Sequence, residues 1–214
     1  MEEIKVRLKP STEVREDFRG ESMILELGPG RNPKYSGAAV TYLDKTEYPG
    51  LSRFVRHDLE QMPLPFPSET FDLIYASHVL EHIVRLPELL DELHRIITPS
   101  GILEVVTPHR DEELRAPYAE HVRFFTKESF RRLENSPYVQ RWRVVDTRTV
   151  YYWKSVLTNS YKKGRYIRSP SLRVVAALAI SVVKSPHLWQ KCELHVKLAP
   201  VYDEKVKASV TDNP

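Results

Sequence analysis

Cysteine is almost absent from this chain, and so are long apolar runs. Cys192 is the single cysteine among 214 residues, which excludes an internal disulfide. No apolar run reaches the ~18–20 residues that a membrane-spanning helix needs. The formal net charge of +3 is too small to favour nucleic acid as a partner. The opening residues Met-Glu-Glu-Ile-Lys lack the basic start and the apolar run of a secretory signal. These absences predict a globular, cytoplasmic protein.

Five short apolar segments in the first half of the chain have the composition of buried β-strands. Turn and helix signals separate them, which is typical of a parallel sheet covered on both faces. The segments are 23–27, 38–43, 53–57, 71–76 and 101–107.

Further elements complete the predicted domain. Apolar residues recur at helical spacing over 86–97, and a second helix is predicted over 127–134 with Thr126 as its N-cap. Residues 143–152 and 193–201 have the composition of two late strands. The pattern predicts one doubly wound α/β domain over 1–202, followed by a polar tail over 203–214. In such a sheet, ligands bind at the carboxyl ends of the strands.

The end of the first strand carries a glycine turn, Glu26-Leu-Gly28-Pro-Gly30. Glycines there allow a tight turn and let a ligand approach the backbone. Asp44 ends the second predicted strand, and Asp58 follows the third. Because carboxylates accept hydrogen bonds from ribose hydroxyls, this succession beside a glycine turn favours a nucleoside site.

These motifs, together with Phe71-Asp-Leu-Ile, Ser77-His-Val-Leu-Glu-His82 and Pro99-Ser-Gly101, resemble class I S-adenosylmethionine-dependent methyltransferases over residues 20–135. The resemblance implies a mostly parallel, seven-stranded sheet, and S-adenosyl-L-methionine as the cofactor. It also implies a place for each cofactor-binding residue. By the resemblance, the methionine part of the cofactor is surrounded by Glu26, Gly28 and Gly30, and its ribose is held by Asp44. The adenine lies beside Asp58 and Leu59, and the sulfonium lies near Ser77 and His78.

The sequence departs from that family in two places. Asn32 occupies the position where a third glycine is common. Residues 46–50 have the composition of a turn, whereas in the family a helix usually follows the second strand. A dinucleotide-dependent oxidoreductase is the nearest competitor on the same fold, but Pro33 occupies the last glycine position of its G-x-G-x-x-G motif. A methyltransferase-like binding protein without turnover is the alternative from another class.

His78-Val-Leu-Glu81-His82 has the H-x-x-E-H spacing of inverted zinc peptidases. A peptidase needs this motif inside an established helix and a third ligand downstream. Here a strand runs directly into it, and the segment is expected to begin the helix after the fourth strand. The methyltransferase resemblance supplies another reason for the string, so no metal is predicted.

A general base is needed only when the acceptor must lose a proton. His109 follows the fifth strand, and His121 lies in a segment that recurs in these enzymes; both are candidate catalytic residues. His78 and His82 are weaker candidates. Arg110 and Arg123 could bind an anionic substrate.

Residues 147–192 read as an insertion before the last strand. They contain nine lysines and arginines and no Asp or Glu, and residues 174–183 form an apolar stretch between Pro170 and Pro186. A helix that is apolar all round must be buried. It would pack on the domain's own core, form a homodimer through 171–185, or rest on a membrane surface as a peripheral anchor. The last case favours an anionic or lipid-linked acceptor, either a small molecule or a glycan.

Overall fold

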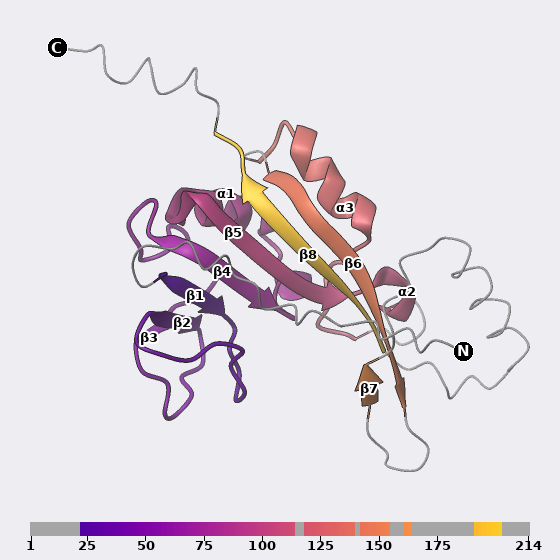
Figure 1. Ribbon diagram of the computed structural model, residues 1–214, viewed down its shortest axis with the longest axis horizontal. Coiled ribbons are helices and arrows are strands. Elements are labelled where there is room, and N and C mark those ends of the chain that lie inside the picture. The colour runs from indigo at the N-terminus through magenta and orange to yellow at the C-terminus, as the bar shows by residue number, and fades with distance from the viewer. Residues whose placement is uncertain (1–21, 114–117, 140–141, 155–160, 164–190, 203–214) are drawn as a thin grey trace, which may run out of the picture.

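The computed structural model describes residues 22–113, 118–139, 142–154, 161–163 and 191–202. Five parallel strands form the first part of a mixed sheet, in the spatial order β3-β2-β1-β4-β5 (Figure 1). Their bounds are β1 Ile24–Leu27, β2 Val40–Asp44, β3 Phe54–Arg56, β4 Phe71–Ser77 and β5 Ile97–Pro108. All five predicted strands are present. β5 begins earlier than expected because Ile97 pairs with Phe71 ahead of a bulge.

Two late strands complete a seven-stranded sheet. β8 (Lys191–Pro200) lies antiparallel between β5 and β6 (Trp142–Lys154), as Figure 1 shows. β7 (Tyr161–Lys163) pairs with the end of β6 and adds a short eighth strand at the edge. The predicted α/β fold class is confirmed. Residues 147–154 of the expected insertion belong to β6, and its apolar stretch over 174–183 lies outside the described residues.

Helix α1 (Leu86–Ile96) turns its apolar residues inward, as its spacing predicts. Its leucines Leu89, Leu90 and Leu93 are buried in the same cluster as the strands. The described residues also form four short helical elements. These are the 3₁₀ turns η1 (Leu80–His82) and η2 (Arg132–Asn135), and the helices α2 (Arg110–Glu113) and α3 (Lys127–Arg131). α3 packs against β6 and β8. Thr126 caps it as predicted, by accepting a hydrogen bond from Ser129 N.

The expected helix start at His78 is wrong. The segment forms only the 3₁₀ turn η1, and the α-helix begins at Leu86. His78 has a φ of +55°, outside the right-handed helical region, and its N–H continues the sheet by donating to Val106 O. Glu81 is drawn into the interior, where it accepts a hydrogen bond from Thr107. These contacts hold the segment against β5 and keep it from starting an α-helix.

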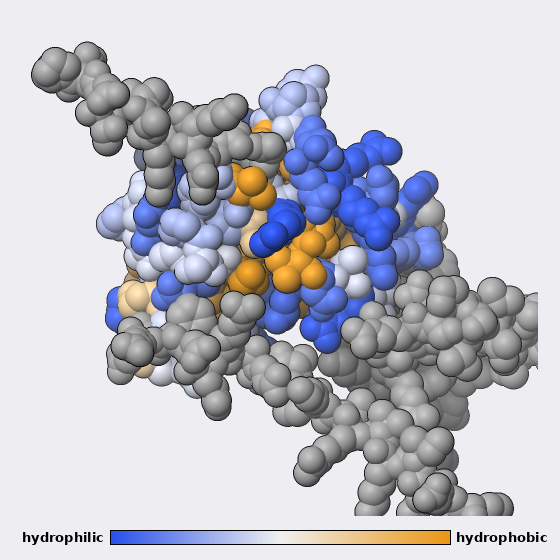
Figure 2. Space-filling view, turned by 45° about the horizontal axis from the view of Figure 1, so that its top comes forward, coloured by the Kyte–Doolittle hydropathy of each residue, from blue (hydrophilic) through white to orange (hydrophobic). Residues whose placement is uncertain are grey.

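Among the described residues, no helix is both long enough and apolar enough to span a membrane. Trp142, at the start of β6, is one of the largest fully buried side chains. Over the face drawn in Figure 2, the surface of the described residues is mostly hydrophilic around a small apolar area. The core therefore lies between the sheet and its helices, and the loops at the carboxyl ends of β1 to β4 are left to form a site.

Candidate functional site

The glycine turn after β1 adopts a conformation that favours glycine. Gly28 and Gly30 both have a φ of +58°, in the left-handed region that other residues rarely adopt. A Cβ atom at Gly28 would lie 2.7 Å from Val79 Cγ2, so the turn packs closely against the segment after β4. A Cβ atom at Gly30 would meet nothing within 4 Å. The turn thus packs tightly on one side and borders open space on the other.

A cavity of about 400 Å³ lies beside this turn. Six of the eight predicted cofactor residues line it: Gly28, Gly30, Asp44, Asp58, Leu59 and His78. The other two, Glu26 and Ser77, line an adjoining cavity of about 370 Å³ that shares Gly28 with the first. The fold therefore brings all eight predicted residues around one turn.

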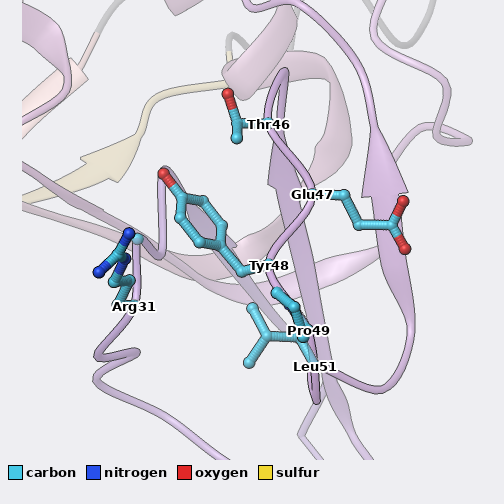
Figure 3. A pocket seen from close by; sticks show the side chains of 7 residues that line it. Arg31, Thr46, Glu47, Tyr48, Pro49 and Leu51 are labelled. Carbon is cyan, nitrogen blue, oxygen red and sulfur yellow. The ribbon is translucent and has the colours of Figure 1, made fainter.

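A third cavity of about 460 Å³ borders the same turn at Gly30. Residues 46–51 form its opposite wall, and the Tyr48 ring stands between Arg31 and the rest of that loop (Figure 3). Thr46 and Tyr48 also line the 400 Å³ cavity. The turn at 46–50 was predicted from its composition, but its contribution to the site was not predicted. The available signal was an aromatic residue next to Pro49-Gly50, directly after a strand-end aspartate.

Asp44 is the last residue of β2, and Asp58 lies two residues beyond the end of the neighbouring strand β3. Asp44 Oδ1 accepts a hydrogen bond of 2.9 Å from Thr46 N, and Asp58 Oδ1 accepts one of 3.0 Å from Glu60 N. Each bond runs from the residue two positions later, the pattern of a local aspartate turn. Both carboxylates are therefore fixed by their own loops at the rim of the same cavity.

Glu26 is buried near the end of β1, with 3% of its surface exposed. Its two oxygens accept hydrogen bonds from Lys34 N at 2.7 Å and Tyr35 N at 3.0 Å. Burial raises the pKa of Glu26, while the two backbone N–H groups act in the opposite direction. The carboxylate thus fixes the loop that follows the glycine turn and lines the adjoining cavity.

His78 lies between two buried carboxylates. Its Nε2 atom is 3.1 Å from Glu193 Oε1, and its Nδ1 atom is 3.3 Å from Glu81 Oε1. The hydrogen bond to Glu193, followed by the interaction with Glu81, raises the pKa of His78 to about 9, although burial opposes the shift. The imidazole is therefore protonated at neutral pH and is a poor proton acceptor there. This pairing could not be predicted from the sequence, because Glu193 comes from β8, 115 residues away.

The two predicted catalytic histidines lie along the same edge of the sheet, but neither lines the three cavities described above. His109 follows β5, bridges to Phe125, and accepts a hydrogen bond of 3.2 Å from Asp111 N. Burial lowers the pKa of His109, and nearby Asp111 acts against that shift. His121 packs its ring against His82, with a centroid separation of 4.6 Å.

The two arginines considered for anion binding differ in their contacts. Arg123 donates to Ile83 O at 2.9 Å and to Val84 O at 2.6 Å, so its guanidinium holds two loops together. Arg110 is exposed at the start of α2, and its backbone N–H donates to Phe125 O. Only the Arg110 side chain stays a candidate for an anionic substrate.

A family model described as a methyltransferase domain matches residues 13–135, more than half of the chain. Among curated proteins, the sterol 24-C-methyltransferase ERG6B from Gibberella zeae is 36% identical over 93 residues. That match covers 36% of this chain and 24% of the fungal protein, so the chain spans about a quarter of that relative's length.

Two further comparisons extend over more of the chain. An uncharacterized protein from Methanocaldococcus jannaschii is 28% identical over 166 residues, covering 72% of this chain and 68% of that protein. The crystal structure of an S-adenosylmethionine-dependent methyltransferase from Archaeoglobus fulgidus superposes with a TM-score of 0.57 at 19% identity. It covers 85% of this chain and 87% of its own, and at that identity the likeness is one of fold.

Proposed function

The chain belongs to the methyltransferase domain family, and we propose that it transfers a methyl group from S-adenosylmethionine to a small-molecule or glycan acceptor. The cavity beside the glycine turn carries this proposal. It combines Gly30, which leaves space for a ligand, with the fixed carboxylates of Asp44 and Asp58. No dinucleotide motif competes with it, because Pro33 interrupts the glycine spacing.

The residues around the turn fit a ligand that contains a ribose and an adenine. Vicinal hydroxyls donate hydrogen bonds and carboxylates accept them, so Asp44 would hold the ribose. Leu59, Val79 and Ile83 give the same cavity apolar groups for the base. Asp58 stands next to Leu59 and would accept a hydrogen bond from the nucleoside.

The adjoining cavity fits the amino-acid end of the same ligand. Glu26 supplies a buried carboxylate there, and Ser77 and Tyr75 supply hydroxyl groups. An ammonium group donates hydrogen bonds to such acceptors and stabilises the charged form of a buried carboxylate. Gly28 is common to both cavities and keeps their junction free of a side chain.

S-adenosylmethionine, when bound, supplies a methyl carbon that an acceptor atom can attack in line with the carbon–sulfur bond, so that this bond breaks and S-adenosylhomocysteine leaves. The chain contributes mainly by orienting the reactants. Holding the two reacting groups in line removes much of the entropic cost of bringing them together in the reaction. His78 would not remove the acceptor's proton, since its pKa of about 9 keeps it protonated at neutral pH. Burial lowers the pKa of His109, which favours the neutral form that a general base needs.

The acceptor is proposed to be anionic or lipid-linked. The support is the composition of residues 147–192, which hold nine cations and no Asp or Glu. Arg110 adds an exposed cation directly after β5, beside His109. The sterol methyltransferase relative acts on a lipid, as its name states, but its match covers only 36% of this chain.

Titration calorimetry with S-adenosylhomocysteine tests the cofactor site. Asp44→Ala should weaken binding by about 1–3 kcal/mol, the usual value of hydrogen bonds to a charged group. Asp146→Ala is the matched control, because it removes the same charge from an exposed position on β6. An unchanged dissociation constant in a folded Asp44→Ala variant would move the ribose elsewhere.

Two outcomes would overturn the proposed activity. No detectable binding of S-adenosylhomocysteine at ~1 mM would contradict an S-adenosylmethionine site of any useful affinity. Binding without a methylated product, measured by mass spectrometry over a broad panel of hydroxyl, amine and carboxylate acceptors, would instead indicate a binding protein without turnover.

A further inference from the structure

One cluster of metal-ligating side chains lies at the rim of the cofactor cavity. Within the part of the chain that the structure describes, Glu81, His82 and His121 each offer one ligand atom, and these atoms lie within 4.8 Å of one another. His82 is also part of the cavity wall. We propose that these three residues bind a divalent transition-metal ion beside the cofactor site.

Glu81 provides the first argument. Its side chain is almost fully buried, with 1% of the residue exposed, and its Oε2 atom accepts a hydrogen bond from the Thr107 hydroxyl. Its Oε1 atom is buried and has no hydrogen-bond partner among the described residues; it lies 3.3 Å from His78 Nδ1, at ion-pair distance but outside hydrogen-bond geometry. A buried carboxylate oxygen without a donor is costly. The protonated His78 ring at 3.3 Å offsets part of that cost, and a cation in direct contact with the oxygen would remove the rest.

His82 provides the second argument, through its tautomer. Its Nδ1 atom lies 3.2 Å from the backbone oxygen of Glu120. A carbonyl oxygen only accepts hydrogen bonds, so in the neutral ring Nδ1 carries the proton and Nε2 carries a lone pair. Metal-ligating histidines commonly have this arrangement, in which one nitrogen donates to a carbonyl and the other binds the ion.

The third argument is that the two parts of the cluster are fixed against each other. Val122 N and Arg123 N both donate to Glu81 O, at 2.9 and 3.2 Å, and the Arg123 side chain binds the two carbonyls that follow η1. Ligands of a tetrahedral ion at about 2.0–2.1 Å are about 3.4 Å apart. Shifts of the ligand atoms by little more than ~1 Å, through side-chain rotation, would therefore bring them to the distances that an ion requires.

Two histidines and one carboxylate are the ligands of catalytic zinc sites and of non-haem iron sites, and they leave coordination positions open. His82 also lines the cavity beside the glycine turn, so an ion held here could bind an oxygen atom of the acceptor; this role, unlike the ion binding itself, rests on the proposed function. His78 is not a ligand, because both its nitrogens face carboxylates. The set therefore differs from that of an inverted zinc peptidase, in which both histidines of the motif bind the ion.

Titration of the EDTA-treated, dialysed protein with Co²⁺, followed by visible absorption and calorimetry, tests the site. We expect one ion per chain. Loss of a residue that only supports the ligands of a metal typically lowers metal affinity 10–100-fold. His82→Ala and His121→Ala remove ligands themselves, so each should lower the affinity for Co²⁺ by at least ~100-fold. His57→Ala is the matched control, because the His57 ring also meets a backbone carbonyl, Gln61 O at 2.7 Å, outside the cluster.

The proposal is overturned if no saturable binding occurs below ~1 mM Co²⁺, or if both ligand variants bind as tightly as the wild type, which would place the ion elsewhere. Both variants change side chains that are not deeply buried, and circular dichroism would verify their folding. S-adenosylhomocysteine binding, measured on the same samples without metal, separates the two proposals. Its loss contradicts the proposed function, whereas loss of Co²⁺ binding alone contradicts only the metal site.

Discussion

His78 stands where β4 ends and the site begins, and its left-handed backbone determines the arrangement around it. The φ of +55° turns the chain so that the imidazole reaches Glu193 on β8 and Glu81 on η1. Left-handed conformations are costly for residues other than glycine, and they cluster at functional sites. Glu193 Oε2 also lies 3.3 Å from His195 Nε2, which extends the network along β8. One histidine thus connects the cofactor turn to the antiparallel half of the sheet.

Alanine substitutions at the two glycines should affect folding and binding differently. Both positions have a left-handed φ, which costs a non-glycine residue about 1–2 kcal/mol. Only at Gly28 would the new Cβ meet Val79, at 2.7 Å, and such overpacking typically costs a further ~1–3 kcal/mol. We expect urea unfolding to show the larger loss of stability for Gly28→Ala. Equal losses in the two variants would mean that Val79 moves aside freely.

His109→Gln should lower turnover by ~10²–10⁴-fold if His109 is the general base, and should leave the affinities for S-adenosylhomocysteine and Co²⁺ unchanged. A base must be unprotonated to act, and burial lowers the pKa of His109 below its ordinary value of about 6.5. Wild-type turnover should therefore fall only as the pH drops below ~6.5. Wild-type turnover in His109→Gln would exclude it as the base. His121→Ala is the comparison, since its predicted loss of Co²⁺ affinity distinguishes a metal ligand from a base.

At the scale of elements, the sequence predicts those parts that depend on local periodicity. The buried strands and α1 follow from apolar spacing, and the start of α3 follows from the Thr126 cap. The 3₁₀ turn η1 could not be predicted, because Glu81 is held by Thr107 on another strand. The approach of His121 to His82 likewise depends on backbone bonds between segments about 40 residues apart. The residues at strand ends can therefore be predicted from local sequence patterns, whereas contacts between loops depend on tertiary structure.

Helix α1 carries a titratable group into the core, which should make the fold sensitive to acid. His94 is 5% exposed and packs its ring against Trp142 at 5.4 Å and Tyr202 at 4.6 Å. Burial lowers its pKa, so the unfolded chain binds this proton more readily than the folded one. The contribution of neutral His94 to stability is complete above the unfolded pKa of about 6.5, and is lost as the pH falls toward the lower folded value.

The test replaces the titrating ring with one that does not titrate. His94→Phe keeps an aromatic ring at this position and removes the ionisation. The free energy of unfolding, measured with urea at pH 7.5 and 5.5, should fall less between the two pH values in the variant than in the wild type. The same decrease in both proteins would assign the acid sensitivity to other groups.

At the scale of the whole molecule, the topology places the strands that flank residues 164–190 next to the site. β8 runs antiparallel to β5, with Glu193 paired to Pro108, so β8 begins at the carboxyl end of β5. β6 ends at the same edge, because Tyr152 pairs with Lys191. Residues 164–190 are thus joined at both ends, through β7 and β8, to the edge that carries the candidate site. This supports a role of that segment at the acceptor end.

We therefore expect salt-sensitive binding to anionic vesicles. Each lysine or arginine close to an anionic bilayer contributes about 1 kcal/mol, and the attraction weakens as salt shortens the Debye length. Reversing three cations of the segment, with Arg165→Glu, Arg168→Glu and Arg173→Glu together, should weaken co-sedimentation by ~100-fold or more. The control reverses three exposed arginines elsewhere: Arg131, Arg132 and Arg143.

The comparison needs neutral vesicles, low and high salt, and sedimentation equilibrium on the same protein. Binding to anionic vesicles alone, lost in high salt and in the segment variant but kept in the control, would establish a peripheral anchor beside the acceptor site. A monomer that ignores both kinds of vesicle would leave packing of 174–183 on the domain's own core. A concentration-dependent dimer without vesicle binding would assign 171–185 to a homodimer interface, since a helix that is apolar all round must be buried by one of these partners.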